Sequence, residues 1–561
     1  MTKQSIEGKL SIYQVLPRLF DNPDDGQVPN GGIETNGSGK FSAFTDEALS
    51  AISDLGCTHI WYTGVLDHAT QSAFPGKPAD HPAIVKGKAG SPYAIRDYYD
   101  VAPELAEKTE ERIQEYQDLI KRSHTAGLRV IQDFVPNHVS RAYSSTMKPD
   151  YVADFGEGDD RSVPFAKNNN YYYLPNSTLV LGVPKGKEYT EFPARATGND
   201  VFSASVSAND WYETVKLNYG IDYSTGIHHT APPVPDTWQK MLDILLYWCA
   251  MGVDGFRCDM AEMVPSEFWH WCIGQVHNIY PEVIFIAEIY CPDRYLEYVN
   301  AGFGYLYDKV GLYDTLMAVL MGQAPASAIT HCWQSTQSVK GHLLHFMETH
   351  DEQRLASDFL IGCGHRAFPA MAVSTLIDNG PILTYFGQEL NERGMDAEGY
   401  SGRDGRTSIF DYWQVPTIRQ WIGKDRDYSG RTLPKEGQIL REKYRWLLNL
   451  AVHEKVFGKG QFFDLMYANA ECLDMGSQYA FLRAVDGEFA LVVVNFSDRP
   501  IECMVRIPEH AFGTLHIQRG GLFYVTDPAT DRVGVAQARP DDLYPIEVPE
   551  YGVAIRHFVR P

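Results

Sequence analysis

The sequence predicts an α/β protein built on a (β/α)8 TIM barrel, with a domain inserted after strand 3 and a C-terminal antiparallel β-sandwich domain. Eight short apolar runs recur up to Phe386, and amphipathic helical patterns lie between them. Alternating buried strands and helices indicate a parallel sheet, and eight such units favour closure into a barrel. The predicted strands are Ser11–Pro17, Thr58–Thr63, Leu128–Phe134, Asp254–Asp259, Val283–Ile289, Tyr305–Val310, Leu343–Glu348 and Pro381–Phe386.

Two helices are clearest from the spacing of their apolar side chains. Across Thr109–Ala126, the side chains of Ile113, Tyr116 and Ile120 fall on one helical face. The segment Thr237–Met251 repeats the pattern with Trp238, Met241, Leu242, Leu245, Trp248 and Cys249. Because the active site of such a barrel gathers at the carboxyl ends of its strands, the chemistry is expected where the strands finish.

Two segments fall outside the barrel pattern. Residues 139–236 separate the third strand from the fourth helix, far beyond the usual connection of about 2 to 6 residues, and predict an inserted domain. After a helical stretch at Pro434–His453, alternating segments such as Tyr479–Val485 and Glu488–Asn495 predict a terminal β domain. The expected division is a catalytic barrel at 1–138 and 237–455, an inserted domain at 139–236 and a C-terminal β domain at 456–561.

Composition narrows the classes of partner. Lys and Arg number 49 against 72 Asp and Glu, giving a formal charge of -23, so nucleic acid would be repelled. No window approaches the roughly 18 apolar residues of a membrane span. The nine cysteines are odd in number and lack paired close spacings, which argues against a disulfide framework or a zinc site. We expect a non-exported protein of the reducing cytoplasm, and the oligomeric state stays open.

Polar side chains end four of the predicted strands. The third strand runs into residues 133–138 and presents Asn137 and His138 at the barrel mouth. In the fourth strand, the period of two places Arg257 and Asp259 on the same side, where the guanidinium can hold Asp259 ionised as a nucleophile requires. Taken singly, Asn137 and His138 fit a capped turn with a structural histidine better than a functional site, and Arg257 with Asp259 fits an ordinary ion pair equally well.

Carboxylates also end the fifth and seventh strands. The fifth closes on Glu288, whose charge would be costly beside apolar residues unless it is used or protonated. The seventh closes on Glu348, followed by His350 and Asp351, and a structural contact between these two is the alternative. Three carboxylates and two histidines on one rim would repel one another without a cationic ligand or transition state. Together the four strand ends predict a catalytic site.

These segments, in this order and spacing, resemble the conserved regions of the α-amylase family, glycoside hydrolase family 13. The resemblance runs from about Ile12 to Trp413. Further matches are Gly380–Glu389 at the eighth strand, Val215–Asn218 in the inserted domain, and Tyr93–Val101 before the third helix.

The resemblance implies a retaining mechanism, in which two carboxyl groups about 5 to 5.5 Å apart act as nucleophile and as general acid/base. Asp259 would attack the anomeric carbon and Glu288 would protonate the leaving oxygen. We expect the charge on Asp259 to raise the pKa of Glu288 and keep its proton in place. Asp351 matches the third acid of the family, which holds sugar hydroxyls. The remaining substrate contacts are expected from His138, His350, Tyr93 as an aromatic floor, and Arg257.

The chain departs from the family pattern in three places. Glucan-cleaving members usually carry Lys-His where this chain has Glu262 and Met263, and that Lys reaches the leaving-group side of the cleft, so the resemblance does not carry over the binding of the leaving group. Ala94 stands where many exo-acting α-glucosidases have an Asp that clamps a non-reducing end. This argues against an end-specific glucosidase and favours linear maltooligosaccharides or dextrins.

The third departure concerns calcium. Many members bind it through the asparagine matched by Asn137 and an Asp of the inserted domain, but here Lys216 stands at that Asp position. We therefore expect no metal and no cofactor, and hypothesise that the ammonium of Lys216 replaces the ion; the alternative is that Lys216 points to solvent. The acidic cluster Asp21–Gly26 lacks an alternating ligand pattern and is predicted to be a loop.

The sequence thus predicts a retaining α-glycosidase that hydrolyses α-1,4-linked glucans or maltooligosaccharides. A transglycosylase using the same Asp259 and Glu288 is the alternative, distinguished by products longer than the substrate. A non-catalytic carbohydrate-binding barrel is a third reading, against which stand three clustered carboxylates that a pure binder does not need. The C-terminal domain lacks a pair of Trp residues for a starch platform, so structural support is the expected role.

Overall fold

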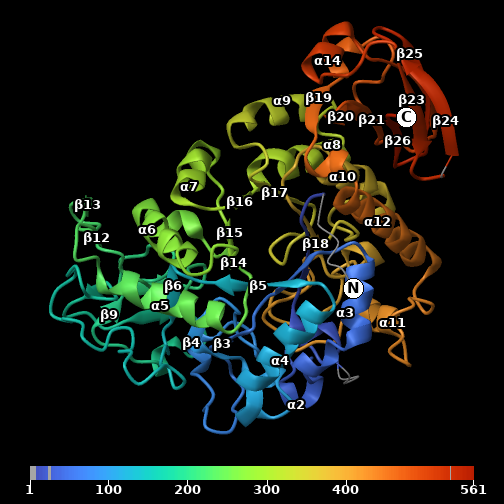
Figure 1. Ribbon diagram of the computed structural model, residues 1–561. Coiled ribbons are helices and arrows are strands. Elements are labelled where there is room, and N and C mark those ends of the chain that lie inside the picture. Colours follow the sequence, from blue (N-terminus) through green and yellow to red (C-terminus); the bar gives the residue numbers. More distant parts are fainter. Residues whose placement is uncertain (1–7, 23–26, 531) are drawn as a thin grey trace.

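The computed structural model describes residues 8–22, 27–530 and 532–561, and its centre is a closed barrel of eight parallel strands (Figure 1). Each strand lies within its predicted run, so the predicted barrel is confirmed. Neighbours around the barrel follow the chain order, and the last strand pairs with the first. The strands are β1 (Ser11–Val15), β2 (His59–Tyr62), β5 (Arg129–Phe134), β14 (Gly255–Cys258), β15 (Ile284–Ala287), β16 (Tyr305–Tyr307), β17 (Leu343–Phe346) and β18 (Ile382–Tyr385).

Helices surround the barrel, and their apolar faces bury against its strands. The two helices predicted from apolar spacing are α4 (Arg112–Thr125), preceded by a 3-10 turn, and α5 (Asp236–Ala250). In α4 the predicted face is confirmed by Tyr116 and Ile120, which are buried together with Leu119. Others are α3 (Asp46–Asp54), α6 (Ser266–His277), α7 (Tyr295–Ala301), α8 (Asp314–Leu320), α9 (Ala328–Ser335), α10 (Gly364–Leu376), α11 (Pro416–Ile422) and α12 (Lys435–His453).

The chain between β5 and α5 is built of short strands and loops. It begins with β6 (His138–Ser140), which pairs antiparallel with β11 (Thr214–Lys216) and so sets His138 beside Lys216. A small apolar core of its own includes Leu179, Leu181 and Val206. The other strands are β7 (Tyr173–Leu174), β8 (Val180–Gly182), β9 (Ala194–Arg195), β10 (Ser205–Ser207), β12 (Ile221–Asp222) and β13 (Ile227–His228).

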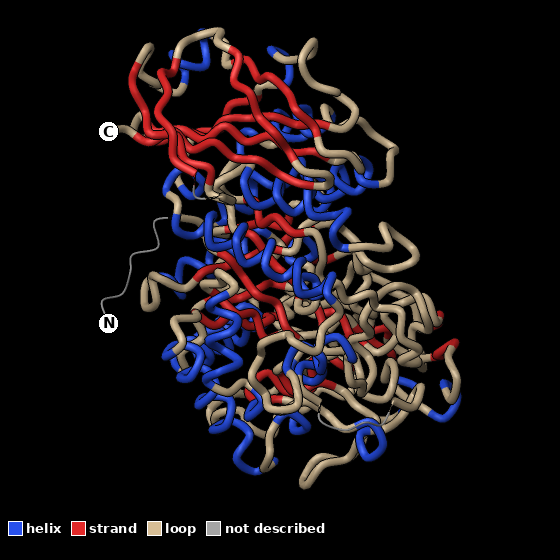
Figure 2. The backbone as a smooth tube through the Cα atoms, turned by 90° about the vertical axis from the view of Figure 1, so that its right-hand side faces the viewer, coloured by secondary structure: helices blue, strands red, loops and turns tan. Residues whose placement is uncertain are grey.

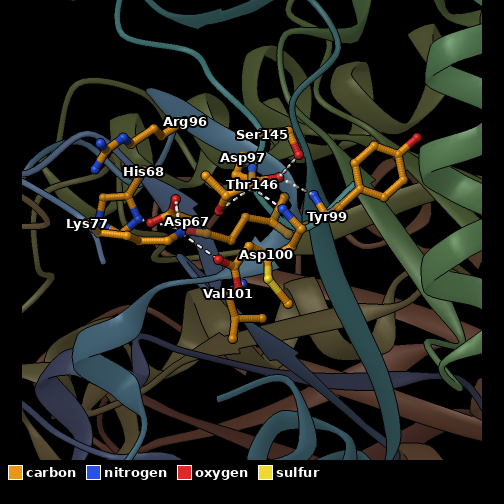
Figure 3. A network of polar contacts seen from close by, with 12 residues as sticks. Asp67, His68, Lys77, Arg96, Asp97, Tyr99, Asp100, Val101, Ser145 and Thr146 are labelled. Atoms are coloured by element: carbon orange, nitrogen blue, oxygen red, sulfur yellow. Dashed lines mark hydrogen bonds and ion pairs between the residues drawn. The ribbon is translucent and has the colours of Figure 1, made fainter. Parts of the chain in front are cut away.

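Buried acids tie the long loop after β2 to this inserted segment (Figure 3). The loop forms a hairpin of β3 (Leu66–His68) and β4 (Ile95–Val101). Asp97 on β4 accepts hydrogen bonds from the Ser145 hydroxyl and the Thr146 backbone N–H of the insertion. The ammonium of Lys77 lies between the carboxylates of Asp67 and Asp100. These contacts fix two loops that both extend to the barrel mouth.

The C-terminal segment forms an antiparallel β-sandwich that lies beside the barrel, against helix α10 (Figure 2), as predicted. A two-stranded sheet packs on the six-stranded one, and buried Arg483 donates to the carbonyl of Leu376 at the end of α10. The larger sheet has the order β19 (Gln461–Asp464), β20 (Gln478–Val485), β21 (Glu488–Asn495), β26 (Gly552–Val559), β23 (Gly521–Asp527) and β24 (Arg532–Ala538); the smaller pairs β22 (Ile501–Arg506) with β25 (Leu543–Val548).

Two predictions reach beyond the described residues. Most of the predicted Asp21–Gly26 loop lies outside them, although Asp21 itself is buried and pairs with Arg419 and Arg426. The first seven residues of the predicted barrel domain also lie outside. Among the described residues, none of the helices is long and apolar enough to cross a membrane.

Candidate active site

A cavity of about 290 Å³ opens at the carboxyl ends of the barrel strands. It is lined by all three predicted catalytic carboxylates, Asp259, Glu288 and Asp351. Of the residues expected to contact substrate, Tyr93, His138 and His350 also line it. The four strand ends singled out in the sequence therefore converge on one site.

Arg257 is the exception, because it lies beneath the cavity and is fully buried. Its Nη1 lies 2.8 Å from Oδ1 of Asp259, and its Nη2 lies 2.9 Å from Oε2 of Glu288. The rings of Trp61, Tyr93 and Tyr307 surround the guanidinium at 5.3 to 5.4 Å. Arg257 thus joins the carboxyl groups of Asp259 and Glu288 by one delocalised charge and does not itself line the cavity.

Asp259 is positioned by the barrel sheet, since its backbone N–H donates to the carbonyl of Phe134 at 2.8 Å. Burial raises the pKa of Asp259, while the charge of Arg257 and its hydrogen bond oppose this shift. The next residue, Met260, has a left-handed φ of 45°, which a non-glycine residue adopts only where its surroundings hold it. The Met260 N–H donates to Oε2 of Glu288 at 2.6 Å.

Glu288 combines burial with two hydrogen-bond donors and one ion pair. The Met260 N–H donates to its Oε2 and the hydroxyl of Tyr290 donates to its Oε1 at 2.6 Å, while the guanidinium of Arg257 forms the ion pair. The pKa of Glu288 is raised, chiefly by burial; Arg257 lowers it, Asp259 raises it, and the bonds from Tyr290 and Met260 lower it. The predicted direction is therefore confirmed, but burial is a larger cause than the charge on Asp259.

His350 is held in one tautomer by its neighbours. The amide nitrogen of Gln14 faces Nδ1 at 2.8 Å, so Nδ1 is the acceptor and Nε2 carries the hydrogen. Nε2 then faces the hydroxyl of Tyr93 at 2.7 Å and Oδ2 of Asp351 at 3.1 Å. Burial, assisted by the charge of Arg257, lowers the pKa of His350 well below its usual value and keeps the ring neutral.

Asp351 and His138 complete the polar lining. The side chain of Asp351 is 45 % exposed, and desolvation by the surrounding protein together with the nearby charge of Glu288 raises its pKa. His138 lies 5.2 Å from the ring of Trp211, and burial, with contributions from Lys216 and Lys86, lowers its pKa to about 3. His138 is therefore a neutral hydrogen-bonding group at neutral pH.

The comparisons with known proteins agree with this geometry. The family model of the α-amylase catalytic domain matches residues 14–294, just over half of the chain. The chain belongs to the α-amylase family. It is 25 % identical over 400 residues to the α-amylase MalA of Haloarcula japonica, covering 68 % of this chain and 44 % of MalA. It is 27 % identical over 253 residues to Maltase 1 of Drosophila virilis, covering 44 % of this chain and 30 % of that protein. The chain thus spans less than half the length of these two relatives.

Solved structures share the fold of this chain over nearly its whole length. The maltogenic α-amylase AmyB from Thermotoga neapolitana superposes with a TM-score of 0.62 at 18 % identity, covering 98 % of this chain and 99 % of AmyB. The α-amylase from Geobacillus thermoleovorans superposes with a TM-score of 0.63 at 15 % identity, covering 99 % of both chains. At these identities the likeness establishes the architecture alone.

The ammonium group of Lys216 is buried beside Asn137. Lys216 is only 2 % exposed, so the alternative that it points to solvent is wrong. Its Nζ contacts the side-chain oxygen of Asn137, Oδ1 of Asp200 at 2.8 Å and the carbonyl of Met263 at 3.3 Å. Burial lowers the pKa of Lys216, and the charge of Asp200 opposes that shift. In the part of the chain that the structure describes, no group of three His, Cys, Asp or Glu side chains is arranged to hold a metal.

Three other residues singled out in the sequence, Glu262, Met263 and Glu348, do not line this cavity. Glu262 and Met263 line a neighbouring cavity of about 380 Å³, and the carbonyl of Glu262 accepts a hydrogen bond from Arg294 at 2.9 Å. Glu348, the end of the seventh predicted strand, is buried in an ion pair with Arg354 at 2.9 Å and serves the structure of the barrel.

Sequence reasoning missed several residues of the cavity wall. Tyr290 could have been found, because it stands two residues after Glu288 on the same rim. Lys86, Trp211, Glu213 and Phe410 come from long loops, where no periodic pattern fixes the direction of a side chain.

Proposed function

We propose that this chain is a retaining α-glycosidase that hydrolyses α-1,4-linked glucans or maltooligosaccharides through a covalent glycosyl-enzyme intermediate. The observation that carries the proposal is the bridge made by Arg257, which holds Asp259 and Glu288 side by side in one cavity. Two carboxyl groups facing a common space, one paired with a cation and one with a raised pKa, are the requirement of this mechanism.

In the first step Asp259 acts as the nucleophile. Its oxygen attacks the anomeric carbon, the bond from that carbon to the glycosidic oxygen breaks, and Glu288 gives its proton to the departing oxygen. Arg257 favours the ionised form of Asp259 before attack, and the burial of Glu288 favours the protonated acid. The products are a glycosyl ester on Asp259 and a free sugar chain.

In the second step Glu288 acts as a base. Once the ester forms, Asp259 no longer carries a charge, so one contribution that raises the pKa of Glu288 disappears. Glu288 then accepts a proton from water, the water oxygen bonds to the anomeric carbon, and the ester bond breaks. Asp259 leaves as a carboxylate, and both residues return to their starting states.

The other lining residues suit a sugar ring. His350 carries its hydrogen on Nε2, toward Asp351 and the cavity, so these two groups offer a donor and an acceptor to neighbouring hydroxyls. The ring of Tyr93, stacked on His350 at 5.2 Å, offers an apolar surface to the face of a sugar. His138 is neutral and adds a further hydrogen-bonding group.

We also propose that the ammonium of Lys216 takes the place of a calcium ion. A single positive charge between Asn137, Asp200 and the carbonyl of Met263 joins the inserted segment to the loop after Asp259, as an ion there would. The proposal therefore includes no cofactor.

The test is product analysis of maltoheptaose by mass spectrometry, comparing the wild type with Asp259→Asn. Shorter maltooligosaccharides from the wild type alone support hydrolysis at this site, and initial products in the α configuration, read by NMR, support retention. Chains longer than the substrate would assign transglycosylation instead. No change of substrate by the wild type would overturn the glucan assignment and favour a binding protein.

A further inference from the structure

An ion pair forms part of the wall of the active-site cavity. Lys86 Nζ lies 2.8 Å from Oε1 of Glu213, and the two side chains are only 17 % and 4 % exposed. Both residues line the cavity, together with Phe410. The three come from three separate segments: the loop after β2, the insertion just before β11, and the loop after β18.

These segments pack firmly on one another. The ammonium of Lys86 lies over the ring of Tyr212 at 5.6 Å, and the hydroxyl of Tyr212 lies 3.3 Å from that of Tyr400. The ring of Tyr400 in turn contacts that of Phe410 at 4.9 Å. Rings and the ion pair thus form one continuous wall.

The backbone beside Lys86 packs closely against the loop that carries Phe410, and this contact limits the movement of the wall. Gly87 has a φ of +65°, and a Cβ built there would lie 2.2 Å from the carbonyl of Phe410. The same carbonyl accepts a hydrogen bond from Ala89 N–H at 3.1 Å. Only glycine permits this close approach of the two loops.

The order of strands shows which end of a bound sugar chain would meet the wall. Glu288, which would protonate the leaving group, follows β15, so the departing part of the substrate lies on that side. In the closed barrel β15 stands opposite β1, and the neighbours of β1 are β2 and β18. The loops that follow β2 and β18 carry Lys86 and Phe410. The wall therefore faces the part of the sugar chain that would become attached to Asp259, its non-reducing side.

Glu213 also has an unused acceptor. Its Oε1 pairs with Lys86, but its Oε2 is buried and has no hydrogen-bond partner among the described residues. A buried carboxylate oxygen without a donor is costly, and a sugar hydroxyl would donate to it once the side chain turns Oε2 into the cavity. The terminal residue of a glucan has a free 4-hydroxyl, whereas an internal residue carries another sugar there.

Resting on the proposed function, we propose that Lys86 and Glu213 form a clamp for the non-reducing end of an α-glucan and make the enzyme exo-acting. The free terminal hydroxyls bind the ion pair, and a longer chain cannot continue through the wall. The cavity of about 290 Å³ is at the small end of the roughly 300 to 1,000 Å³ of ligand sites, which suits a short terminal unit. The proposed clamp uses other positions than Ala94, the position at which many exo-acting family members have the Asp of their end clamp.

The test compares maltoheptaose with the same heptasaccharide blocked at its non-reducing end by a 4,6-O-acetal. The wild type is expected to shorten the free substrate at least roughly 100-fold faster than the blocked one, measured by mass spectrometry of the products. Equal rates, from internal cleavage, would overturn the clamp while leaving the proposed function in place. Inactivity on both substrates and on polymeric starch would overturn the proposed function itself, and the clamp with it.

A double variant, Lys86→Ala with Glu213→Ala, tests the wall directly. Opening the wall should raise the rate on the blocked substrate, relative to the free one, by roughly 10-fold or more. Lys108→Ala with Glu111→Ala is the matched control, because that ion pair is exposed and remote from the cavity, and the ratio should not change. An unchanged ratio in a folded double variant contradicts the clamp; if the variant unfolds, the comparison of the two substrates on the wild type decides.

Discussion

The phenolic hydroxyl of Tyr290 lies 2.6 Å from Oε1 of Glu288, on the same rim of the barrel and two residues further along the chain. It is one of two groups that donate to this carboxyl group, the other being the Met260 N–H, and its hydrogen bond favours the ionised form. Tyr290 is therefore a positioning residue that also tunes the proposed acid.

Tyr290→Phe should move the alkaline limb of the pH–rate profile to higher pH. The variant removes a donor that lowers the pKa of Glu288, so the acid keeps its proton to a higher pH, by roughly half to one pH unit. The measurement is kcat/KM against pH on a maltooligosaccharide. Tyr313→Phe is the control, because its hydroxyl makes the same kind of bond, at 3.0 Å, to Glu352 outside the cavity. A limb that moves to lower pH would contradict the assignment.

Glu288→Gln should slow hydrolysis of maltooligosaccharides by about 10² to 10⁴-fold, the usual contribution of a general acid. An aryl α-glucoside with a dinitrophenol leaving group needs no protonation, so formation of its glycosyl ester should be far less affected. The measurement is the burst of phenol followed by slow turnover, since the variant also lacks the base of the second step. If the variant slowed formation of the glycosyl ester equally for both substrates, Glu288 would not be the acid.

Arg257→Met should lower the free energy of unfolding by about 3 to 5 kcal/mol at pH 7, because it leaves Asp259 and Glu288 buried without their cation. The loss should shrink as the pH falls: without Arg257 both pKa values rise further, and the protonated carboxyl groups no longer need a counter-charge. Denaturant unfolding at pH 7 and pH 5 measures this. Arg445→Ala, which breaks an exposed ion pair with Glu442, should cost less than about 1 kcal/mol at either pH.

The sequence predicted the barrel well because each strand is a local pattern that the fold then buries on all sides. All four residues of β14 are buried, for example, and its period of two placed Arg257 next to Asp259 as expected. The polar strand ends, such as Glu288 and Asp351, were predictable for the same reason, since a parallel barrel gathers the carboxyl ends of its strands on one rim.

What the sequence did not predict depends on contacts between distant loops. The pairing of Lys86 with Glu213 joins residues 127 positions apart, and neither position belongs to a periodic pattern. The burial of Arg257 beneath the cavity was missed for another reason: period two gives the side of a strand, but not the depth at which a long side chain ends.

Lys216→Asp should make the stability of the protein dependent on calcium. The new carboxylate would face the oxygens of Asn137, Asp200 and Met263, a set of hard ligands that suits Ca²⁺ once water completes the shell. We expect thermal unfolding of the variant at a lower temperature in EDTA and its recovery by several degrees in millimolar Ca²⁺. Lys216→Met, which adds no carboxylate, should lose stability without recovery. The wild type should unfold at the same temperature in either buffer, because its ammonium already neutralises Asp200; a wild type destabilised by EDTA would refute the replacement.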